Sequence, residues 1–271
     1  MSGHSKWSSI KHKKGAADAK RGKLFSKLTR AIIVAARDGG PDPAANLALQ
    51  NAIEKARSNS MPKDNIDRAI AKGAGTDADS AAYETVVYEG YGPAGVAVIV
   101  ETLTDNRNRT AGEVRHTFAK NDGNLGTSGA VAWLFERRGL VLVPADGTDE
   151  DELMLAAAEG GADDVSLDGS SYQVLSAAEG GAEDVSLDGS SYQVLSAAEE
   201  LASVREAVAA AGFEIESAEL TMLPKTTVAL EDENEAKKIL RLIDQLEEND
   251  DVQEVYANFD IPERVLESVA G

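Results

Sequence analysis

Residues 83–103 read YETVVYEGYGPAGVAVIVETL, two runs rich in β-branched residues on either side of a Gly/Pro-rich segment. This pattern predicts two antiparallel strands joined by a turn. Residues 90–95, GYGPAG, also match the G-x-G-x-x-G dinucleotide-binding pattern, in which the third glycine must open a helix. Here the chain continues after Gly95 into the apolar run VAVIV, so we interpret the segment as a hairpin turn and not as a cofactor loop.

Helices and further strands are expected on the C-terminal side of this hairpin. Thr110 and Glu113 have the spacing of a capping box and predict a helix that carries Val114 and Phe118. AVAWLFE and LVLVP predict two strands around a turn at residues 137–139. The later elements are expected in this order: helix 150–159, strand YQVLS, helix ELASVREAVAAAG, strands SAELTML and TTVAL, helix ENEAKKILRLIDQLEE and strand VQEVYANF. Strands alternating with single helices indicate small α+β sandwiches with helices on one face of each sheet.

On the N-terminal side, three short helices are expected between about residues 24 and 72. Phe25, Leu28 and Ile32 lie at helical spacing before two glycines, and residues 46–57 and 61–72 repeat that pattern. The three helices could share one small core. Residues 73–82 read as a linker, and residues 1–22 lack apolar periodicity and read as a flexible basic arm.

Charge is unevenly distributed along the chain, which has a formal net charge of −20. Residues 1–72 contain 15 Lys/Arg against 6 Asp/Glu, whereas residues 73–271 contain 12 against 41. A polyanion would therefore be attracted to the N-terminal part and repelled by the rest. This clustering favours nucleic acid as the partner; a solvated basic surface that balances an acidic body is the alternative.

A tandem duplication lies in the acidic part. Residues 157–179 recur at 177–199 with a single change, Asp163 to Glu183. Two copies are too few for a solenoid. We expect one copy to supply the YQVLS strand and the other to be a tolerated loop or an extra edge hairpin, because loop closure becomes only slowly more unfavourable with length.

The sequence contains no recognisable catalytic or metal-binding motif. Cysteine is absent, no Walker A or G-x-S-x-G motif occurs, and none of the three histidines has a second ligand at metal spacing. No catalytic residues, metal or cofactor are expected. No apolar run approaches the roughly 18 residues of a membrane span, and the basic N-terminal stretch lacks the apolar h-region of a secretory signal, so we expect a soluble cytoplasmic protein.

The residues expected to bind nucleic acid are the cations of the arm and first helix, with an aromatic side chain for stacking on a base. A second group follows the hairpin in TDNRNRT at 104–110. Lysine and arginine neutralise phosphates and tryptophan stacks on bases. Trp7 could instead pack on the protein's own core, and the second group could be internal ion-pair partners. The full set is Lys6, Trp7, Lys11, His12, Lys13, Lys14, Lys20, Arg21, Lys23, Lys27, Arg107, Arg109 and Arg115.

Long blocks of the chain closely resemble the YebC family, which also includes the mitochondrial translational activator of cytochrome c oxidase. These blocks are GHSKW at 3–7, IKHKK at 10–14, AKRGKLFSKL at 19–28, MPKDNIDRAI at 61–70, residues 88–118, and GAVAWLFERRG at 129–139. The resemblance implies an α+β multidomain protein: an N-terminal three-helix domain and two small α+β, ferredoxin-like domains, the third inserted in the second, around a central cavity. The expected boundaries are an arm at 1–22, a helical domain at 23–75, a second domain at 80–133 plus 222–271, and a third at 134–221. The family has one copy of the duplicated segment.

The resemblance also implies a function in gene expression. Family members are described as DNA-binding transcriptional regulators, and others resemble ribosome-associated translation factors that help synthesis through consecutive prolines. We expect a monomeric, non-catalytic DNA-binding regulator of transcription, with a factor that contacts ribosomal RNA or tRNA as the alternative. RNA is favoured by the lack of a recognition helix with clustered Arg, Asn or Gln. A purely structural or protein-interaction module is a third interpretation.

Overall fold

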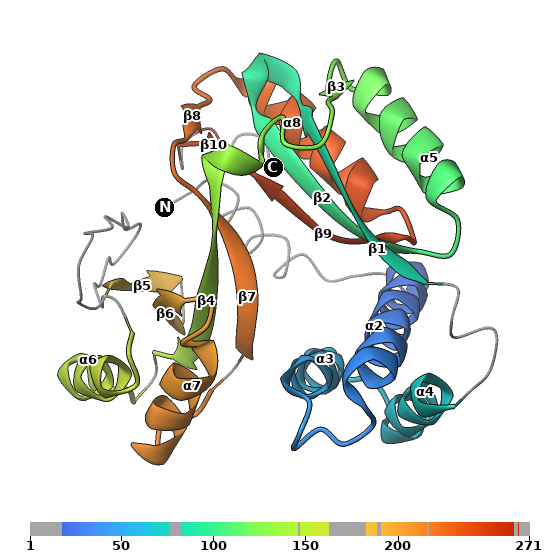
Figure 1. The fold of residues 1–271 in the computed structure, drawn as a ribbon. Coiled ribbons are helices and arrows are strands. Elements are labelled where there is room, and N and C mark those ends of the chain that lie inside the picture. Colours follow the sequence, from blue (N-terminus) through green and yellow to red (C-terminus); the bar gives the residue numbers. More distant parts are fainter. Residues whose placement is uncertain are drawn as a thin grey trace. The chain divides into compact units, whose positions relative to one another are not determined.

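The computed structural model describes residues 18–75, 83–145, 147–162, 183–188, 191–215, 217–262 and 265, of which 18–21, 183–188 and 191 are described by their backbone only. The chain divides into two compact units (Figure 1). The insert unit is Glu136–Leu223, and the main unit contains the described residues before and after it. Helices and antiparallel sheets in both units confirm the α+β multidomain class, with the third domain inserted in the second. No helix in these ranges is long and apolar enough to cross a membrane.

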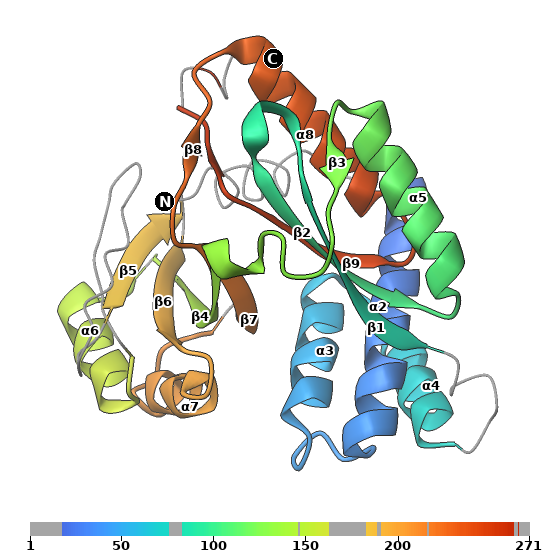
Figure 2. The same ribbon diagram turned by 45° about the horizontal axis from the view of Figure 1, so that its top comes forward.

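Three helices begin the main unit, as expected: α2 (Asp18–Gly39), α3 (Leu47–Ser58) and α4 (Lys63–Ala74). Figure 2 shows them as a small bundle. Their shared core includes Leu28, Ile32, Leu49, Ile53 and Ile66, all at most 5% exposed. Apolar residues at helical spacing therefore make this core, as the sequence predicted.

The start of α2 differs from expectation. The helix begins at Asp18, inside the segment 1–22 that was expected to be a flexible arm. Residues 18–21, Asp-Ala-Lys-Arg, are compatible with a helix, and an acidic residue suits the positive end of the helix dipole. The rest of the predicted arm, residues 1–17, lies outside the described residues.

The sheet of the main unit is built on the hairpin. Strands β1 (Glu84–Tyr91) and β2 (Ala97–Thr104) pair antiparallel around the 3-10 turn η1 (Pro93–Gly95), which confirms the turn interpretation of GYGPAG. A side-chain Cβ at Gly92 would lie 2.6 Å from Ile239 Cδ1, so this glycine allows close packing. The strand order is β3-β1-β2-β9, with β3 at Asn124–Leu125 and β9 at Val252–Ala257. Strands β8 (Val228–Ala229) and β10 (Phe259–Asp260) form a separate parallel pair.

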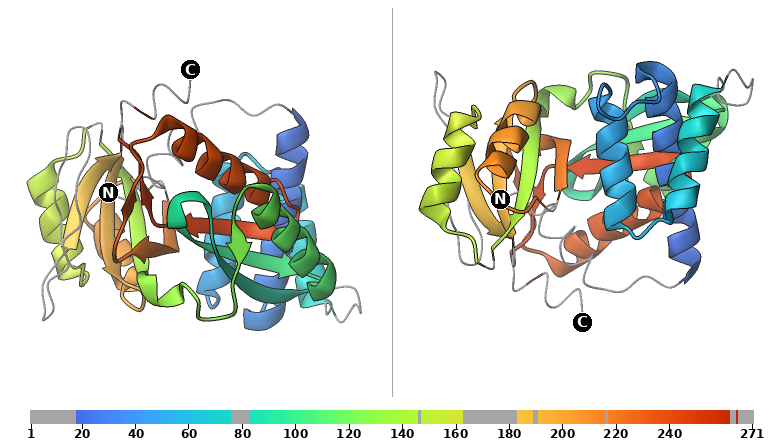
Figure 3. Two further views of the ribbon diagram at one scale, coloured as in Figure 1. Left: turned by 90° about the horizontal axis from the view of Figure 1, so that it is seen from above. Right: turned by 90° about the horizontal axis from the view of Figure 1, so that it is seen from below.

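Helices lie on both sides of this sheet. Seen from above in Figure 3, α5 (Arg107–Lys120) and α8 (Glu233–Glu247) lie over the strands, and from below α2–α4 do. The capping box predicted at Thr110 is wrong, because Asn106 is the N-cap and its side chain accepts a hydrogen bond from the Arg109 amide at 3.1 Å. Thr110 instead lies within α5, fully buried, where it bonds a residue distant in sequence.

The insert unit has the order strand–helix–strand–strand–helix–strand. Its elements are β4 (Phe135–Pro144), α6 (Glu150–Glu159), β5 (Glu183–Asp188), β6 (Ser191–Ala197), α7 (Leu201–Ala210) and β7 (Ser217–Pro224). The sheet order is β5-β6-β4-β7, and the core contains Val141, Leu153, Val194, Val204 and Val208.

The turn predicted at residues 137–139 is wrong. Residues 135–144 form one continuous strand, preceded by the 3-10 turn η2 (Ala132–Leu134). Gly139 belongs to this strand because a Cβ there would lie 2.4 Å from Ser196 Oγ and 3.0 Å from Leu201 Cβ. The glycine thus permits close packing and does not mark a turn.

The second copy of the duplication supplies both β5 and β6. The YQVLS strand is therefore formed by that copy, as β6, and pairs antiparallel with β4. The EDVSLD segment adds β5, which lies at the edge of the sheet. Most of the first copy, residues 163–176, lies outside the described residues, and the prediction of a loop or hairpin there stays a prediction.

Candidate nucleic-acid interface

The predicted binding residues differ in how far the structure describes them. Lys6, Trp7, Lys11, His12, Lys13 and Lys14 lie outside the described residues. Lys20 and Arg21 lie in the first turns of α2, with only their backbone described. The side chains of Lys23, Lys27, Arg107, Arg109 and Arg115 are described, and they fall into two groups.

The first group lies on one face of α2 and bonds main-chain carbonyls at the C-terminal end of α8. Lys23 Nζ donates to the Glu248 carbonyl at 3.2 Å and Lys27 Nζ donates to that of Glu247. Arg30 continues the row, and its Nη1 donates to the Asp250 carbonyl at 2.6 Å. Helix C-termini present unpaired carbonyls and partial negative charge, so cations stabilise them. We call Lys23, Lys27 and Arg30 the α2 clamp.

Asp251 lies where the clamp meets the sheet and is only 3% exposed. Its Oδ1 accepts from Arg30 at 3.0 Å, and its Oδ2 accepts from Arg109 and Thr110 at 2.7 Å each and from Thr104 at 3.1 Å. Burial raises the pKa of the Asp251 carboxyl, but the hydrogen bonds from Arg109, Thr110 and Thr104 outweigh it, and the pKa lies below its usual value. This carboxylate therefore stays charged and links α2, β2 and α5.

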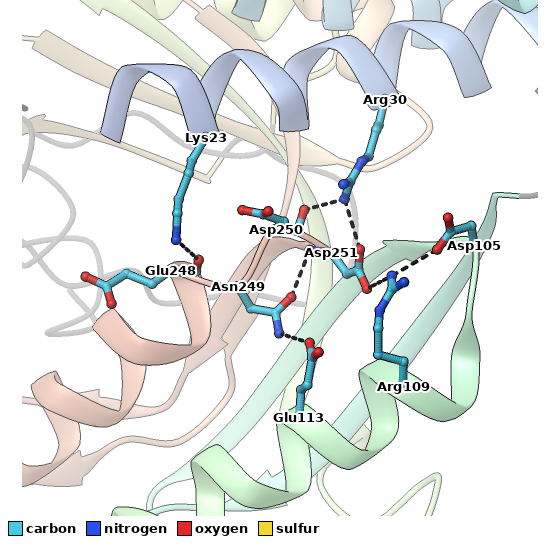
Figure 4. A pocket seen from close by; sticks show the side chains of 9 residues that line it. All are labelled: Lys23, Arg30, Asp105, Arg109, Glu113, Glu248, Asn249, Asp250 and Asp251. Carbon is cyan, nitrogen blue, oxygen red and sulfur yellow. Dashed lines mark hydrogen bonds and ion pairs between the residues drawn. The ribbon is translucent and has the colours of Figure 1, made fainter. Parts of the chain in front are cut away.

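A hollow of about 380 Å³ opens beside this network (Figure 4). Three cations and five carboxylic side chains line it, together with Asn249. Asn249 Nδ2 donates to Glu113 at 2.7 Å, while its Oδ1 accepts from the Asp251 amide at 2.8 Å. Because carboxylates outnumber cations, the hollow is a poor site for a phosphate group.

The three arginines of the second group have different surroundings. Arg109 pairs with Asp251 at 2.7 Å and with Asp105 at 2.9 Å, and these hydrogen bonds raise its pKa above the usual arginine value. The ion-pair interpretation therefore describes Arg109, and a phosphate contact by it stays a prediction. Arg107 and Arg115 are exposed on the same helix and form no ion pair with another described residue.

Exposed cations also occur on α3 and α4. Arg57, Lys63 and Lys72 are exposed and form no ion pair within the described part of the chain. Arg68 bonds only its own helix, through Asn65 Oδ1 and the Asp64 carbonyl. Lys55, in contrast, is paired with Glu254.

Sequence reasoning missed Arg30, Thr104 and Asp251. A signal for Arg30 was present, because residues 23, 27 and 30 lie at i, i+4 and i+7 and so share one helix face. Asp251 carried no such signal, since it is one carboxylate among 47 and all of its side-chain partners are more than 140 residues away in sequence.

Comparisons with known proteins cover almost the whole chain. The family model described as "TACO1/YebC protein N-terminal domain" matches residues 5–76, and "TACO1/YebC second and third domain" matches residues 83–259. A probable transcriptional regulatory protein of Rubrobacter xylanophilus is 56% identical over 271 residues and is matched over its full length. A second relative, probable transcriptional regulatory protein GSU1074 of Geobacter sulfurreducens, is 51% identical over 99% of this chain and 100% of its own.

A solved structure is also similar. The crystal structure of the conserved hypothetical protein Aq1575 from Aquifex aeolicus aligns with a TM-score of 0.74 at 48% identity, covering 91% of this chain and 93% of that one. Family models, relatives and fold agree. The chain belongs to the TACO1/YebC family.

Proposed function

We propose that this protein is a non-catalytic nucleic-acid-binding regulator of gene expression, acting in the cytoplasm as a monomer, and in the first place a DNA-binding regulator of transcription. One observation carries this: within the described residues 22–72, internal contacts do not occupy all of the cations. The α2 clamp and Lys55 are bonded internally, but Arg57, Lys63 and Lys72 stay exposed, and the sequence places six further cations before the clamp. The names of the relatives support a regulatory role.

The acidic part of the chain would contribute orientation. Residues 73–271 carry 41 Asp/Glu against 12 Lys/Arg and repel a polyanion. A nucleic acid would therefore approach the N-terminal end, and nonspecific adhesion elsewhere would be weak.

A second candidate function is RNA binding during translation, and the surface of α4 favours it. Helices α3 and α4 are joined by the short connection 59–62, as in a helix-turn-helix motif. A recognition helix places its N-terminal side chains on base edges, but the exposed ones on α4 include Asp64 and Asp67. Carboxylates there would repel the phosphates that flank a major groove, which favours a target recognised by its shape.

Direct binding measurements with matched charge variants test the proposal. Labelled duplex DNA and a folded RNA of equal length would be titrated with the full chain over a series of salt concentrations. Replacing Lys11, Lys13 and Lys14 with Glu should weaken binding strongly and flatten its salt dependence, because each lost phosphate contact removes about 0.9 from the slope for B-DNA. Lys237→Glu with Arg241→Glu, on the exposed face of α8, is the matched control and should change affinity little.

Sedimentation separates the two candidate functions. Crosslinks from the Lys11–Lys27 region to defined promoter DNA, without co-sedimentation with ribosomes, would support transcription. Co-sedimentation with ribosomal particles and crosslinks to ribosomal RNA would support translation. Wild-type protein that binds neither nucleic acid at low salt would contradict the proposal.

A further inference from the structure

The indole of Trp133 is held outside the core of the main unit. It lies in η2 and is 66% exposed, whereas Val131 and Phe135 beside it are at most 5% exposed. Its Nε1–H donates to the Ala130 carbonyl at 3.2 Å. A buried indole N–H usually finds a protein partner, whereas an exposed one can bond water; here a carbonyl of the loop accepts it although the ring is exposed. The ring is therefore exposed to solvent while its Nε1–H is hydrogen-bonded within the loop.

A buried carboxylate fixes the loop that carries this ring. Glu89, on β1, is 6% exposed. It accepts hydrogen bonds from the amides of Gly129 at 2.7 Å and of Val131 and Ala132 at 2.8 Å each. Burial raises the pKa of Glu89, but these three bonds outweigh it and hold the pKa below its usual value, so the group is charged. Three charge-assisted bonds therefore hold the backbone of the loop that carries Trp133.

A second aromatic ring is tied to the same carbonyl. Tyr91 is 38% exposed, and its hydroxyl donates to the Ala130 oxygen at 3.2 Å. Both polar groups are thus satisfied by one loop atom, while much of each side chain is open. Pre-positioned aromatic groups lose little conformational entropy on binding, which suits them to recognition.

The loop that carries the ring is uncharged, and the exposed Glu136 follows it in the chain. Residues 126–134, GTSGAVAWL, contain no charged side chain. The amide of the exposed Lys225 donates to the Leu134 carbonyl at 2.8 Å, which brings a basic residue next to the loop. The Glu89 charge is compensated by the three amides that surround it. A ligand that carries phosphate is therefore not repelled by the loop itself.

We infer that Trp133, with Tyr91 beside it, is a stacking platform for an unpaired nucleobase. This inference rests on the proposed function and deepens it, because it specifies a base that is not stacked in a duplex. Two exposed rings offer far less area than the roughly 800 Å² per partner of a stable protein interface, but one indole is sufficient for one base. Aromatic stacking tolerates any base, so the platform adds affinity without sequence specificity.

The test uses the full chain with Trp7→Phe, which leaves Trp133 as the only tryptophan. Oligouridine, oligothymidine and a duplex of equal charge would be titrated, with Trp133 fluorescence and the anisotropy of labelled oligonucleotide as readouts. We expect both single strands to quench Trp133. Trp133→Leu should weaken single-strand binding about 10-fold or more, the effect of losing one base stack, and Trp133→Phe should retain most of the affinity. Binding of the duplex should not change.

Leu155→Ala is the matched control, because Leu155 is equally exposed at 66% but lies on α6 of the insert unit. Salt-dependent nucleic-acid binding that Trp133→Leu does not alter would overturn the platform and leave the proposed function standing. Equal quenching by the duplex would overturn it as well. A wild-type chain that binds no nucleic acid would overturn the proposed function and the platform together. Quenching by oligouridine alone would assign the platform to RNA, and quenching by both strands would assign it to any unpaired base.

Discussion

The cations of α2 and those of α5 have the same chemistry but different partners. Lys23, Lys27 and Arg30 donate to the end of α8, whereas Arg107 and Arg115 on α5 are exposed and form no ion pair with another described residue. All of these residues except Arg30 were expected to contact phosphate. The difference teaches that clustered lysine and arginine predict a negatively charged partner but do not identify it. The carbonyls at a helix C-terminus attract cations, as a phosphate group does.

Spacing explains part of this difference. Residues 23, 27 and 30 share one helix face, and the carbonyls of residues 247, 248 and 250 follow one another from the last residue of α8 onward. Of the three α5 arginines, only Arg109 pairs with Asp251, at 2.7 Å, and it also pairs with Asp105 on the preceding loop. A row of cations meets a row of carbonyls in the first case, whereas in the second case one arginine of three pairs with a buried carboxylate.

The largest expected effect comes from removing the carboxylate that both groups share. Asp251→Asn should lower the free energy of unfolding by about 2–3 kcal/mol, because Arg30 and Arg109 lose a buried charge partner. Urea unfolding of the full chain measures this. Asp250→Asn is the matched control, since the Asp250 side chain is exposed and its contact to Arg30 uses the main-chain oxygen. Equal losses in the two variants would show that the carboxylate of Asp251 has no special role.

Acid should test the charge of the same group by protonating it in the wild-type protein. The folded-state pKa of Asp251 is lowered, so its contribution to stability is complete above the unfolded-state pKa of about 3.9 and is lost as pH falls through the folded-state value. Melting temperatures between about pH 5 and pH 2 should therefore fall more steeply in the wild type than in Asp251→Asn. Parallel profiles would mean that other carboxylates, Glu89 among them, account for the acid sensitivity.

The smallest effects on stability should separate the two cation groups directly. Lys23→Met with Lys27→Met should lower unfolding free energy by about 1 kcal/mol, since each cation at a helix C-terminus contributes about 0.3–1 kcal/mol. Arg107→Ala with Arg115→Ala should change stability by less than about 0.5 kcal/mol but reduce the salt dependence of nucleic-acid binding. A binding defect in the lysine pair at unchanged stability, with the opposite result in the arginine pair, would reverse the comparison.

Local patterns predicted most of the fold. The Pro/Gly turn of the hairpin and the apolar spacing of α2–α4 depend on neighbouring residues, and both were confirmed. Two predictions failed where a residue serves a distant partner. Gly139 is small because Ser196 and Leu201 approach it, and Thr110 bonds Asp251 instead of capping its own helix. Contacts between residues far apart in sequence cannot be predicted from the spacing of neighbouring residues.

The candidate site was less predictable than the fold for the same reason. The sequence identified a basic N-terminal region, but it could not show that the α2 clamp is bonded to carbonyls, since main-chain acceptors carry no sequence signal. Trp133 lies in AVAWLFE, which was predicted to be a strand; this is wrong for residues 132–134, which form the 3-10 turn η2 and leave the ring 66% exposed. Contacts of Lys11, Lys13 and Lys14 with nucleic acid stay predictions.

The position of β9 in the main-unit sheet has a consequence for biosynthesis. Strand β2 pairs with β9, which follows it in the chain only after the complete insert unit. A nascent chain therefore presents the insert unit as a continuous segment before the main sheet has its last strand, and domains generally fold as units during synthesis. The carbonyls that the α2 clamp requires are made last, so Lys23, Lys27 and Arg30 have no α8 partner until translation has passed residue 250.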